Sequence, residues 1–200
     1  MLPEHCNLKP DDHCTYMGEY TARKGAAHSG TNQLIMNFKK GPDRRGKPDW
    51  GYKAGAIQTV GSSMAHCLRP YAQQLTLVPV PPSKCKTDIA YDDRMIQALA
   101  ECQCQIPDID CRELVIQTHS TRASHESGDR LSSDDLIALY TIEDSLINGA
   151  RGTLLVVDDM LTTGSHYRAM YAVLRARFPG HVIAGLFIAR RVLGCDFDPV

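Results

Sequence analysis

The sequence predicts an α/β fold, a doubly wound parallel sheet with a small N-terminal hood. Three apolar runs support this prediction, at residues 75–80, 154–157 and 182–189. They lack the alternation of half-exposed strands and are typical of strands buried on both faces. Stretches with helical spacing lie between the runs, and polar residues follow each run, as they do at the carboxyl ends of parallel strands.

The chain divides into an N-terminal segment, residues 1–53, and a core, residues 54–200. Residues 16–20 predict a short strand or a turn. Residues 32–40 predict a short helix, with Asn32 as a candidate N-cap. The rest of the segment is polar and interrupted by glycine and proline, so no further element is predicted there.

The core alternates helices and strands. Residues 53–74 predict an amphipathic helix, because apolar residues recur there at helical spacing. A second helix is predicted over residues 91–100, and a third strand over residues 114–118. A further helix is predicted to begin after residue 165 and to end near residue 178.

Composition limits the possible functions. A chain of 200 residues with 43% hydrophobic residues can bury one sizeable core. The formal net charge of −1 gives no general attraction to nucleic acid or to anionic membranes, so any phosphate binding must be local. No stretch approaches the roughly 20 apolar residues that span a bilayer, and the chain has no signal region, so we expect a cytoplasmic protein.

The chain contains eight cysteines. Without a secretory signal we do not expect disulfides. Two His-Cys pairs, His5-Cys6 and His13-Cys14, raise zinc at Cys6 and Cys14 as one alternative. The close C-x-x-C pairs of structural zinc sites are missing, so we prefer the other alternative, ordinary thiols.

The most informative stretch is residues 153–168, T-L-L-V-V-D-D-M-L-T-T-G-S-H-Y-R. Two carboxylates, Asp158 and Asp159, directly follow its apolar run. Residues 162–165 then supply hydroxyls, backbone N–H donors and a glycine immediately before a helix, which is an anion-binding arrangement. Acceptors for a sugar diol beside donors for a phosphate monoester predict a phosphorylated ribose as ligand.

This stretch resembles the phosphoribosyl-pyrophosphate (PRPP) motif of type I phosphoribosyltransferases: a hydrophobic strand, two acids, two hydrophobic residues, then T-x-G and small hydroxyl residues. The resemblance implies that Asp158 and Asp159 are catalytic acids that hold the ribose hydroxyls and, through water, Mg²⁺. The 5′-phosphate loop that it implies consists of Thr162, Thr163, Gly164 and Ser165. His166 departs from the motif, which has a hydroxyl residue at this position.

A second stretch, L-V-P-V-P-P-S-K at residues 77–84, resembles the competence-associated, amidophosphoribosyltransferase-like branch of the same family. The resemblance implies that Ser83, Lys84 and Arg94 bind the pyrophosphate. Two features of the branch are incomplete here, the R-G-F-N-Q sequence at the helix start and the N-terminal cysteine zinc ribbon.

Members of the family close a flexible flap over the site, which the resemblance places at about residues 118–133. Arg122, His125 and Arg130 would then face the pyrophosphate; a solvated loop is the alternative. A basic segment precedes the core and consists of Lys39, Lys40, Arg44, Arg45, Lys47 and Lys53, around Trp50 and Tyr52. It is either solvated, or a lysine from it reaches the pyrophosphate.

The resemblance implies an enzyme of nucleotide metabolism, a phosphoribosyltransferase that uses Mg-PRPP to transfer phosphoribosyl to a small nitrogenous acceptor, often as a homodimer. By analogy the acceptor would bind near Arg190, Arg191 or Phe197. Thr162 disfavours 6-oxopurine salvage, whose enzymes commonly have an acid there. Two alternatives remain open: a non-catalytic PRPP- or nucleotide-binding regulator, and an accessory protein of DNA uptake or processing, against which the net charge argues.

Overall fold

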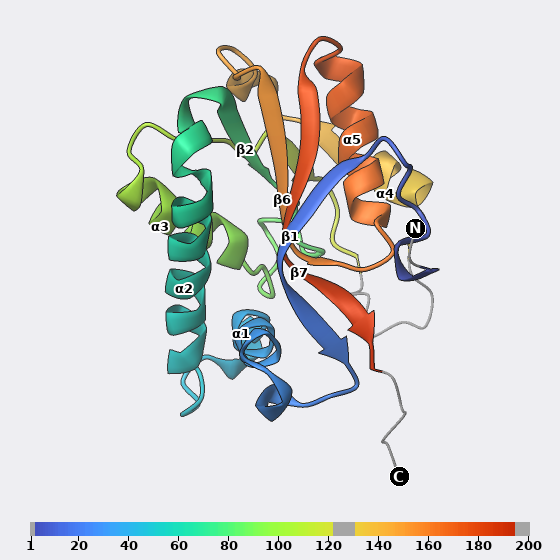
Figure 1. Cartoon of the computed structure of the whole chain (residues 1–200). Coiled ribbons are helices and arrows are strands. Elements are labelled where there is room, and N and C mark those ends of the chain that lie inside the picture. The colour runs from blue at the N-terminus through green and yellow to red at the C-terminus, as the bar shows by residue number, and fades with distance from the viewer. Residues whose placement is uncertain (1–2, 122–130, 195–200) are drawn as a thin grey trace.

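The computed structural model describes residues 3–121 and 131–194 of the chain. Five parallel strands form its central sheet, in the order β1–β7–β6–β2–β3 (Figure 1). The strands are β1 (His13–Ala22), β2 (Leu75–Pro79), β3 (Asp110–Cys111), β6 (Thr153–Leu161) and β7 (Val182–Leu193). The prediction of an α/β fold around a parallel sheet is confirmed.

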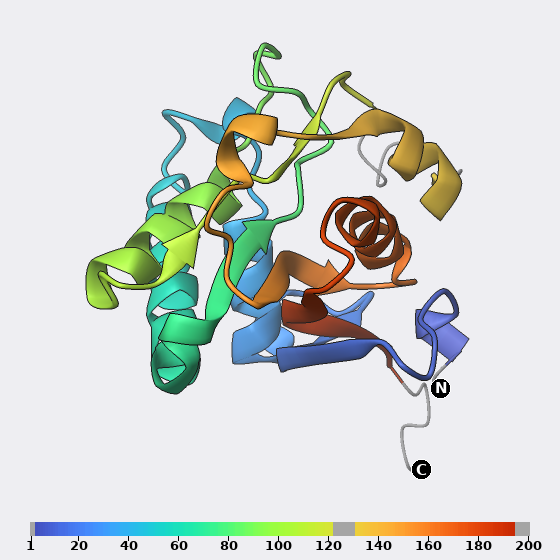
Figure 2. The same ribbon diagram turned by 90° about the horizontal axis from the view of Figure 1, so that it is seen from above.

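Helices cover both faces of the sheet, which makes the fold doubly wound (Figure 2). One face is covered by α1 (Gly30–Phe38), α2 (Gly51–Leu68) and α3 (Arg94–Gln105). The other is covered by α4 (Ser133–Leu139) and α5 (Ser165–Arg177). Two clusters of buried apolar side chains fill the space between the sheet and its helix layers. Burial of both faces explains why the strands read as continuous apolar runs.

Shorter elements connect these layers. The 3₁₀ helices are η1 (Pro3–His5), η2 (Ala26–His28), η3 (Pro42–Arg44), η4 (Arg69–Gln74) and η5 (Asp144–Leu146). Two further strands, β4 (Val115–Gln117) and β5 (Tyr140–Ile142), form a separate antiparallel pair. Within the described residues no helix is both long and apolar enough to cross a membrane.

The strand predicted at residues 114–118 is confirmed as β4, but it lies outside the central sheet. The two-residue strand β3 occupies the position beside β2, where the Thr76 hydroxyl donates to Asp110 Oδ2 at 2.6 Å. The Arg112 N–H still donates to the Leu77 carbonyl of β2 at 2.9 Å, and its guanidinium donates to the carbonyls of Leu146 and Asn148 at 2.7 and 2.6 Å. Beyond this point the chain leaves the sheet, and β4 pairs with β5.

The N-terminal segment contributes to the same layers as the rest of the chain. The predicted strand or turn at residues 16–20 is a ten-residue strand, β1, which pairs with β7 along its length. The predicted helix at residues 32–40 is confirmed as α1, but its N-cap is Ser29 rather than Asn32; the Ser29 hydroxyl accepts from the Asn32 N–H. Ile35 and Phe38 of this helix are fully buried in the core.

Three predicted boundaries shift. The helix predicted at residues 53–74 is α2, which ends at Leu68, because Pro70 in the first turn of the tighter η4 has no N–H to continue an α-helix. The helix expected from residue 91 begins at Arg94. Strand β6 continues through Asp158 and Asp159 to Leu161, so the two acids lie within a strand and not after it.

Candidate functional site

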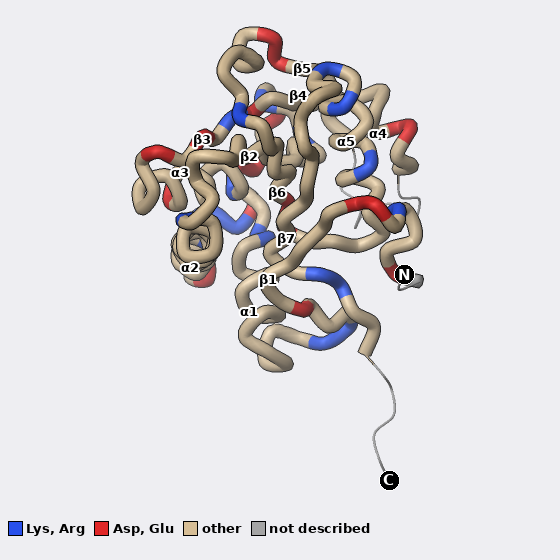
Figure 3. The backbone as a smooth tube through the Cα atoms, turned by 45° about the horizontal axis from the view of Figure 1, so that its top comes forward, with Lys and Arg blue, Asp and Glu red and all other residues tan. Residues whose placement is uncertain are grey.

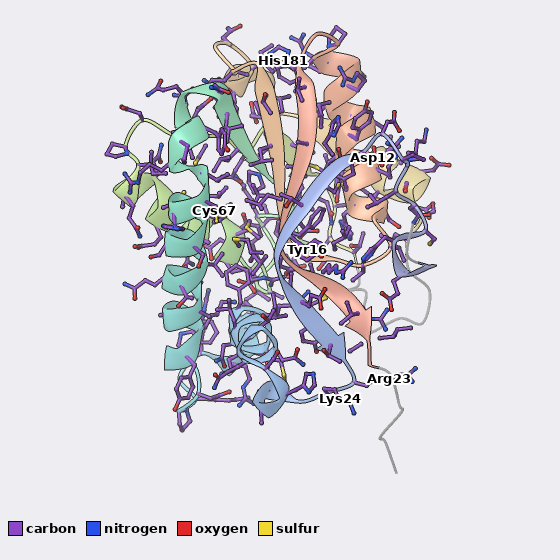
Figure 4. The ribbon with its side chains drawn as sticks, viewed as in Figure 1. Asp12, Tyr16, Arg23, Lys24, Cys67 and His181 are labelled. Atoms are coloured by element: carbon purple, nitrogen blue, oxygen red, sulfur yellow. The ribbon has the colours of Figure 1, made fainter. Side chains whose placement is uncertain are left out.

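A cleft of about 860 Å³ opens at the carboxyl ends of the strands. Figure 4 gives the orientation, with His181 before β7 at one end of the sheet and Arg23 after β1 at the other; Arg23 lines the cleft. The predicted site residues that line it are Ser83, Lys84, Arg94, Asp158, Asp159, Thr162, Thr163 and Ser165. Its volume is in the range of small-molecule sites.

The topology explains why the cleft forms there. Strands β2 and β6 are neighbours, but the chain leaves β2 towards α3 on one face and leaves β6 towards α5 on the other. The loops that follow these strands diverge, and a crevice opens between them. Ligands of open α/β sheets bind at such switch points.

The two acids project to opposite faces of the sheet, because successive side chains of a strand alternate. Asp159 faces α1 and α3: Lys39 Nζ lies 3.0 Å from its Oδ1, and Arg94 Nη2 lies 2.6 Å from its Oδ2. Asp158 faces the α5 layer, where it borders a small cavity with Tyr167 and Phe187. Asp158 forms no ion pair with any described residue.

These surroundings give the acids opposite proton affinities. Burial, and then the charge of Asp159, raise the pKa of Asp158 from 3.8 to about 7. Burial alone would also raise the pKa of Asp159, but Lys39 and Arg94 outweigh it and hold that pKa well below its usual range. At neutral pH the pair therefore carries one full charge, on Asp159, and a second carboxyl that is near its titration midpoint.

A network of ion pairs extends from Asp159 through Arg94 to Asp92 and Lys53. Arg94 Nη1 also lies 2.6 Å from Asp92 Oδ2, and Lys53 Nζ lies 2.8 Å from the same oxygen. Lys53 is only 4% exposed, and burial lowers its pKa despite the bond to Asp92. This network fixes the guanidinium of Arg94 at the wall of the cleft.

Residues 162–165, the candidate phosphate loop, connect β6 to α5. Gly164 has a φ of +90°, a left-handed conformation that favours glycine. The Thr163 and Ser165 hydroxyl oxygens lie 2.9 Å apart. The N–H groups of Thr163 and Gly164 donate to no acceptor among the described residues, and they lie at the amino end of a 13-residue helix, whose dipole favours an anion.

Four residues near the N-terminus cover the outer side of this loop; we call residues 5–8 the strap. His5 Nδ1 lies 2.5 Å from the Thr162 carbonyl oxygen. The Asn7 N–H donates to the Thr163 carbonyl at 2.9 Å, and its side-chain amide donates to Ser165 Oγ at 2.7 Å. Sequence reasoning missed the strap, since no local pattern marks residues so distant in the chain from their partners.

The loop after β2 carries Ser83 and Lys84. The Ser83 carbonyl accepts from the Gln117 side chain and from the Thr121 N–H, both at 2.8 Å. These bonds tie this loop to the start of the predicted flap. The flap residues Arg122, His125 and Arg130 lie outside the described residues.

His166, which departs from the motif, lines the cleft beside the phosphate loop. Its Nδ1 lies 3.0 Å from the hydroxyl oxygen of Tyr140. Burial lowers the pKa of His166, so the imidazole is neutral at pH 7. Since neutral imidazole carries one N–H, the ring can both donate and accept a hydrogen bond at this position.

Most cations of the basic segment are paired. Lys39 and Lys53 contact Asp159 and Asp92, as described above, and Lys40 and Arg44 lie 3.6 and 2.8 Å from the carboxylate of Asp49. Basic and acidic positions are interspersed along the backbone (Figure 3). The segment is therefore largely neutralised within the fold, and Lys39 is the member that reaches the acid pair.

On the acceptor side, Arg191 lines the cleft, whereas Arg190 pairs with Glu19 at 2.5 Å and lies over the ring of Tyr16. Phe197 lies outside the described residues. The apolar side chain of Met36 also lines the cleft.

The cysteines of the described part are free thiols. Cys6 is exposed, whereas burial raises the pKa of Cys14 to about 12, which keeps this thiol protonated. Across residues 3–121 and 131–194, no three His, Cys, Asp or Glu side chains gather as a metal site would require.

No protein-family model matches this chain, and no curated protein matches it.

Proposed function

We propose that this protein is a phosphoribosyltransferase that binds Mg-PRPP in the cleft and transfers phosphoribosyl to a nitrogenous small molecule. The observation that carries the proposal is the meeting of the acid pair and the phosphate loop with Ser83, Lys84 and Arg94 in one cleft at the switch point of the sheet. A ribose 5-phosphate with a pyrophosphate at C1′ needs these three sets of partners side by side.

Each set of residues would bind a different part of the ligand. The hydroxyls and free N–H groups of the phosphate loop would hold the 5′-phosphate, and Asp158 with Asp159 would accept from the ribose hydroxyls. Ser83, Lys84 and Arg94 would hold the pyrophosphate as charge moves onto it and C1′ gains oxocarbenium character. The contribution of the protein would be positioning and charge stabilisation.

Mg²⁺ suits this site as a partner of the ligand. It binds proteins through one or two carboxylates and otherwise keeps water and substrate phosphates, so an acid pair can hold it without a third protein ligand. Asp159 is already bonded to two cations, so Asp158 is the better ligand, through water. When bound, the ion would neutralise charge on the departing pyrophosphate.

The test is calorimetric titration with PRPP, with and without Mg²⁺, followed by a screen for pyrophosphate release with nucleobases and small amines. Binding with release for one acceptor would support the enzyme and name its substrate. Binding without release would favour the non-catalytic regulator. One observation supports that alternative: both oxygens of Asp159 are already bonded to Lys39 and Arg94. If the double variant Asp158→Asn, Asp159→Asn keeps the wild-type affinity for PRPP, the assignment of the site is wrong.

A further inference from the structure

The strap contacts the phosphate loop on the side that faces away from the cleft. None of the strap residues lines the cleft, whereas Thr162, Thr163 and Ser165 do. We propose that the strap orients the loop for anion binding, with Asn7 and His5 as positioning residues. This inference rests on the function proposed above, and it gives a role to a segment that the PRPP motif does not include.

The first argument concerns the peptide planes. The strap bonds to the carbonyl oxygens of Thr162 and Thr163, through His5 Nδ1 and the Asn7 N–H. In a trans peptide the C=O of one residue and the N–H of the next point in opposite directions, and the described part of the chain has no cis peptide. Holding these two carbonyls outward therefore turns the N–H groups of Thr163 and Gly164 away from the strap, towards the side of the cleft.

The second argument concerns the hydroxyl hydrogens. The Asn7 amide donates to Ser165 Oγ, so it uses none of the hydroxyl hydrogens of the loop. The contact between Thr163 and Ser165 uses one of their two hydrogens, whichever residue donates. One hydroxyl hydrogen is left for a phosphate oxygen in either arrangement, because the strap supplies a donor and not an acceptor.

The third argument concerns burial. Leu8 packs against Gly164, where a Cβ would lie 2.8 Å from Leu8 Cδ2. His5 is only 6% exposed, and its Nε2 has no hydrogen-bond partner among the described residues. Burial of His5 keeps water away from the Thr162 carbonyl, so His5 is its partner in place of solvent, whereas Asn7 makes its two bonds from an exposed position.

The variant Asn7→Asp tests the proposal, because it keeps the shape of the side chain and replaces the donor by an acceptor. Ser165 would then donate to the new carboxylate and Thr163 to Ser165, so neither of these two hydroxyls would keep a hydrogen for the ligand. Loss of one hydrogen bond to a charged group predicts a roughly 10- to 100-fold weaker affinity for ribose 5-phosphate, measured by calorimetry. Asn7→Ala removes the donor without reversing it, and we expect a loss of only a few-fold.

Two controls separate this effect from charge and from folding. Cys6→Asp adds the same charge at the neighbouring exposed position and should change the affinity less than threefold. Pyrophosphate alone would bind on the side of Ser83 and Lys84, so its affinity should be the same for wild type and Asn7→Asp. His5→Phe removes the donor to the Thr162 carbonyl and keeps a ring. It should likewise lower the affinity for ribose 5-phosphate and leave the affinity for pyrophosphate unchanged.

The outcomes are distinct. If wild type binds ribose 5-phosphate and Asn7→Asp binds it equally well, the role of the strap is refuted and the proposed function stands. If Asn7→Asp and Cys6→Asp both lower the affinities for ribose 5-phosphate and for pyrophosphate to the same extent, the cause is the added negative charge or a loss of structure, and the strap inference again fails. If wild type binds neither PRPP nor ribose 5-phosphate, the proposed function itself is refuted.

Discussion

Replacing Asp158 by asparagine should make the ligand-free protein more stable at neutral and alkaline pH, although it removes a residue of the proposed site. The carboxyl of Asp158 is half-buried beside the charge of Asp159, and no described cation pairs with it. Asparagine keeps an oxygen that can accept from the Asp159 N–H, as Asp158 Oδ1 does at 2.7 Å. The substitution therefore removes an unfavourable ionisation and preserves the local hydrogen bond.

The size of the effect follows from proton linkage. The pKa of Asp158 rises from 3.8 in the unfolded chain to about 7 in the folded protein. Between these values the folded state holds one more proton than the unfolded state, so wild-type stability falls as pH rises, by about 1.4 kcal/mol per pH unit. The asparagine variant has no such proton. Its advantage should grow by up to about 4 kcal/mol between pH 4 and pH 7 and then level off.

The assay is urea denaturation of both proteins without Mg²⁺ at several pH values from 4 to 9. Parallel stability curves for wild type and Asp158→Asn would refute the reasoning, because they would mean that Asp158 ionises normally in the fold. Asp159→Asn is the matched control with the opposite sign. The low pKa of Asp159 contributes stability above pH 3.8, which is lost as pH falls further, so this variant should be destabilised by roughly 3 kcal/mol at pH 7 and less in acid.

Three further predictions concern stability measured by urea denaturation. Gly61→Ala should lower the free energy of unfolding by about 2 kcal/mol, because the new Cβ would lie 2.5 Å from a side-chain atom of the facing helix. Gly55→Ala is the control on the same helix; its Cβ would have no neighbour within 4 Å, so it should stabilise the protein by about 0.5–1 kcal/mol. Equal effects of the two substitutions would contradict the close approach of α2 and α3. Lys53→Met should lower the free energy of unfolding by about 3 kcal/mol, because the carboxylate of Asp92 would lose one of its two cations. The control, Lys47→Met at an exposed position, should leave the stability nearly unchanged. Gly164→Ala should cost about 1–2 kcal/mol because of its φ of +90°, and an unchanged midpoint would argue against the left-handed turn.

The parts of the structure that the sequence predicted are local. The apolar run and acids of β6, the glycine before α5 and the proline end of β2 each carry their signal within a few residues, and they meet in one cleft because parallel strands end at the same edge of a sheet. The predicted roles of Ser83, Lys84 and Arg94 remain predictions, although their positions in the cleft agree with them.

The parts that were not predicted depend on contacts across the chain. The strap meets the phosphate loop from more than 150 residues away, as His5 and Thr162 show with a separation of 157 residues. Strand β3 is only two residues long and gives no periodicity, so no local pattern predicts it, and the strand predicted at residues 114–118 does not reveal that its partner is β5 and not β2. Local pattern likewise does not reveal that Lys39 and Arg94 meet on the same carboxylate.

The placement of the two acids on opposite faces of β6 also matters for protein design. Asp159 takes its partners from α1 and α3, whereas Asp158 borders side chains of α5 and β7. A substitution at Lys39 would alter the surroundings of one acid and leave the packing around the other in place, and a substitution at Phe187 would do the reverse. The sheet thus separates the packing of the two acids but not their charges, because Asp159 raises the pKa of Asp158, and Lys39 and Arg94 lower it from the opposite face. The contacts of one acid can therefore be changed alone, in the laboratory or by natural selection, but a change of charge on one face also shifts the proton affinity of the acid on the other.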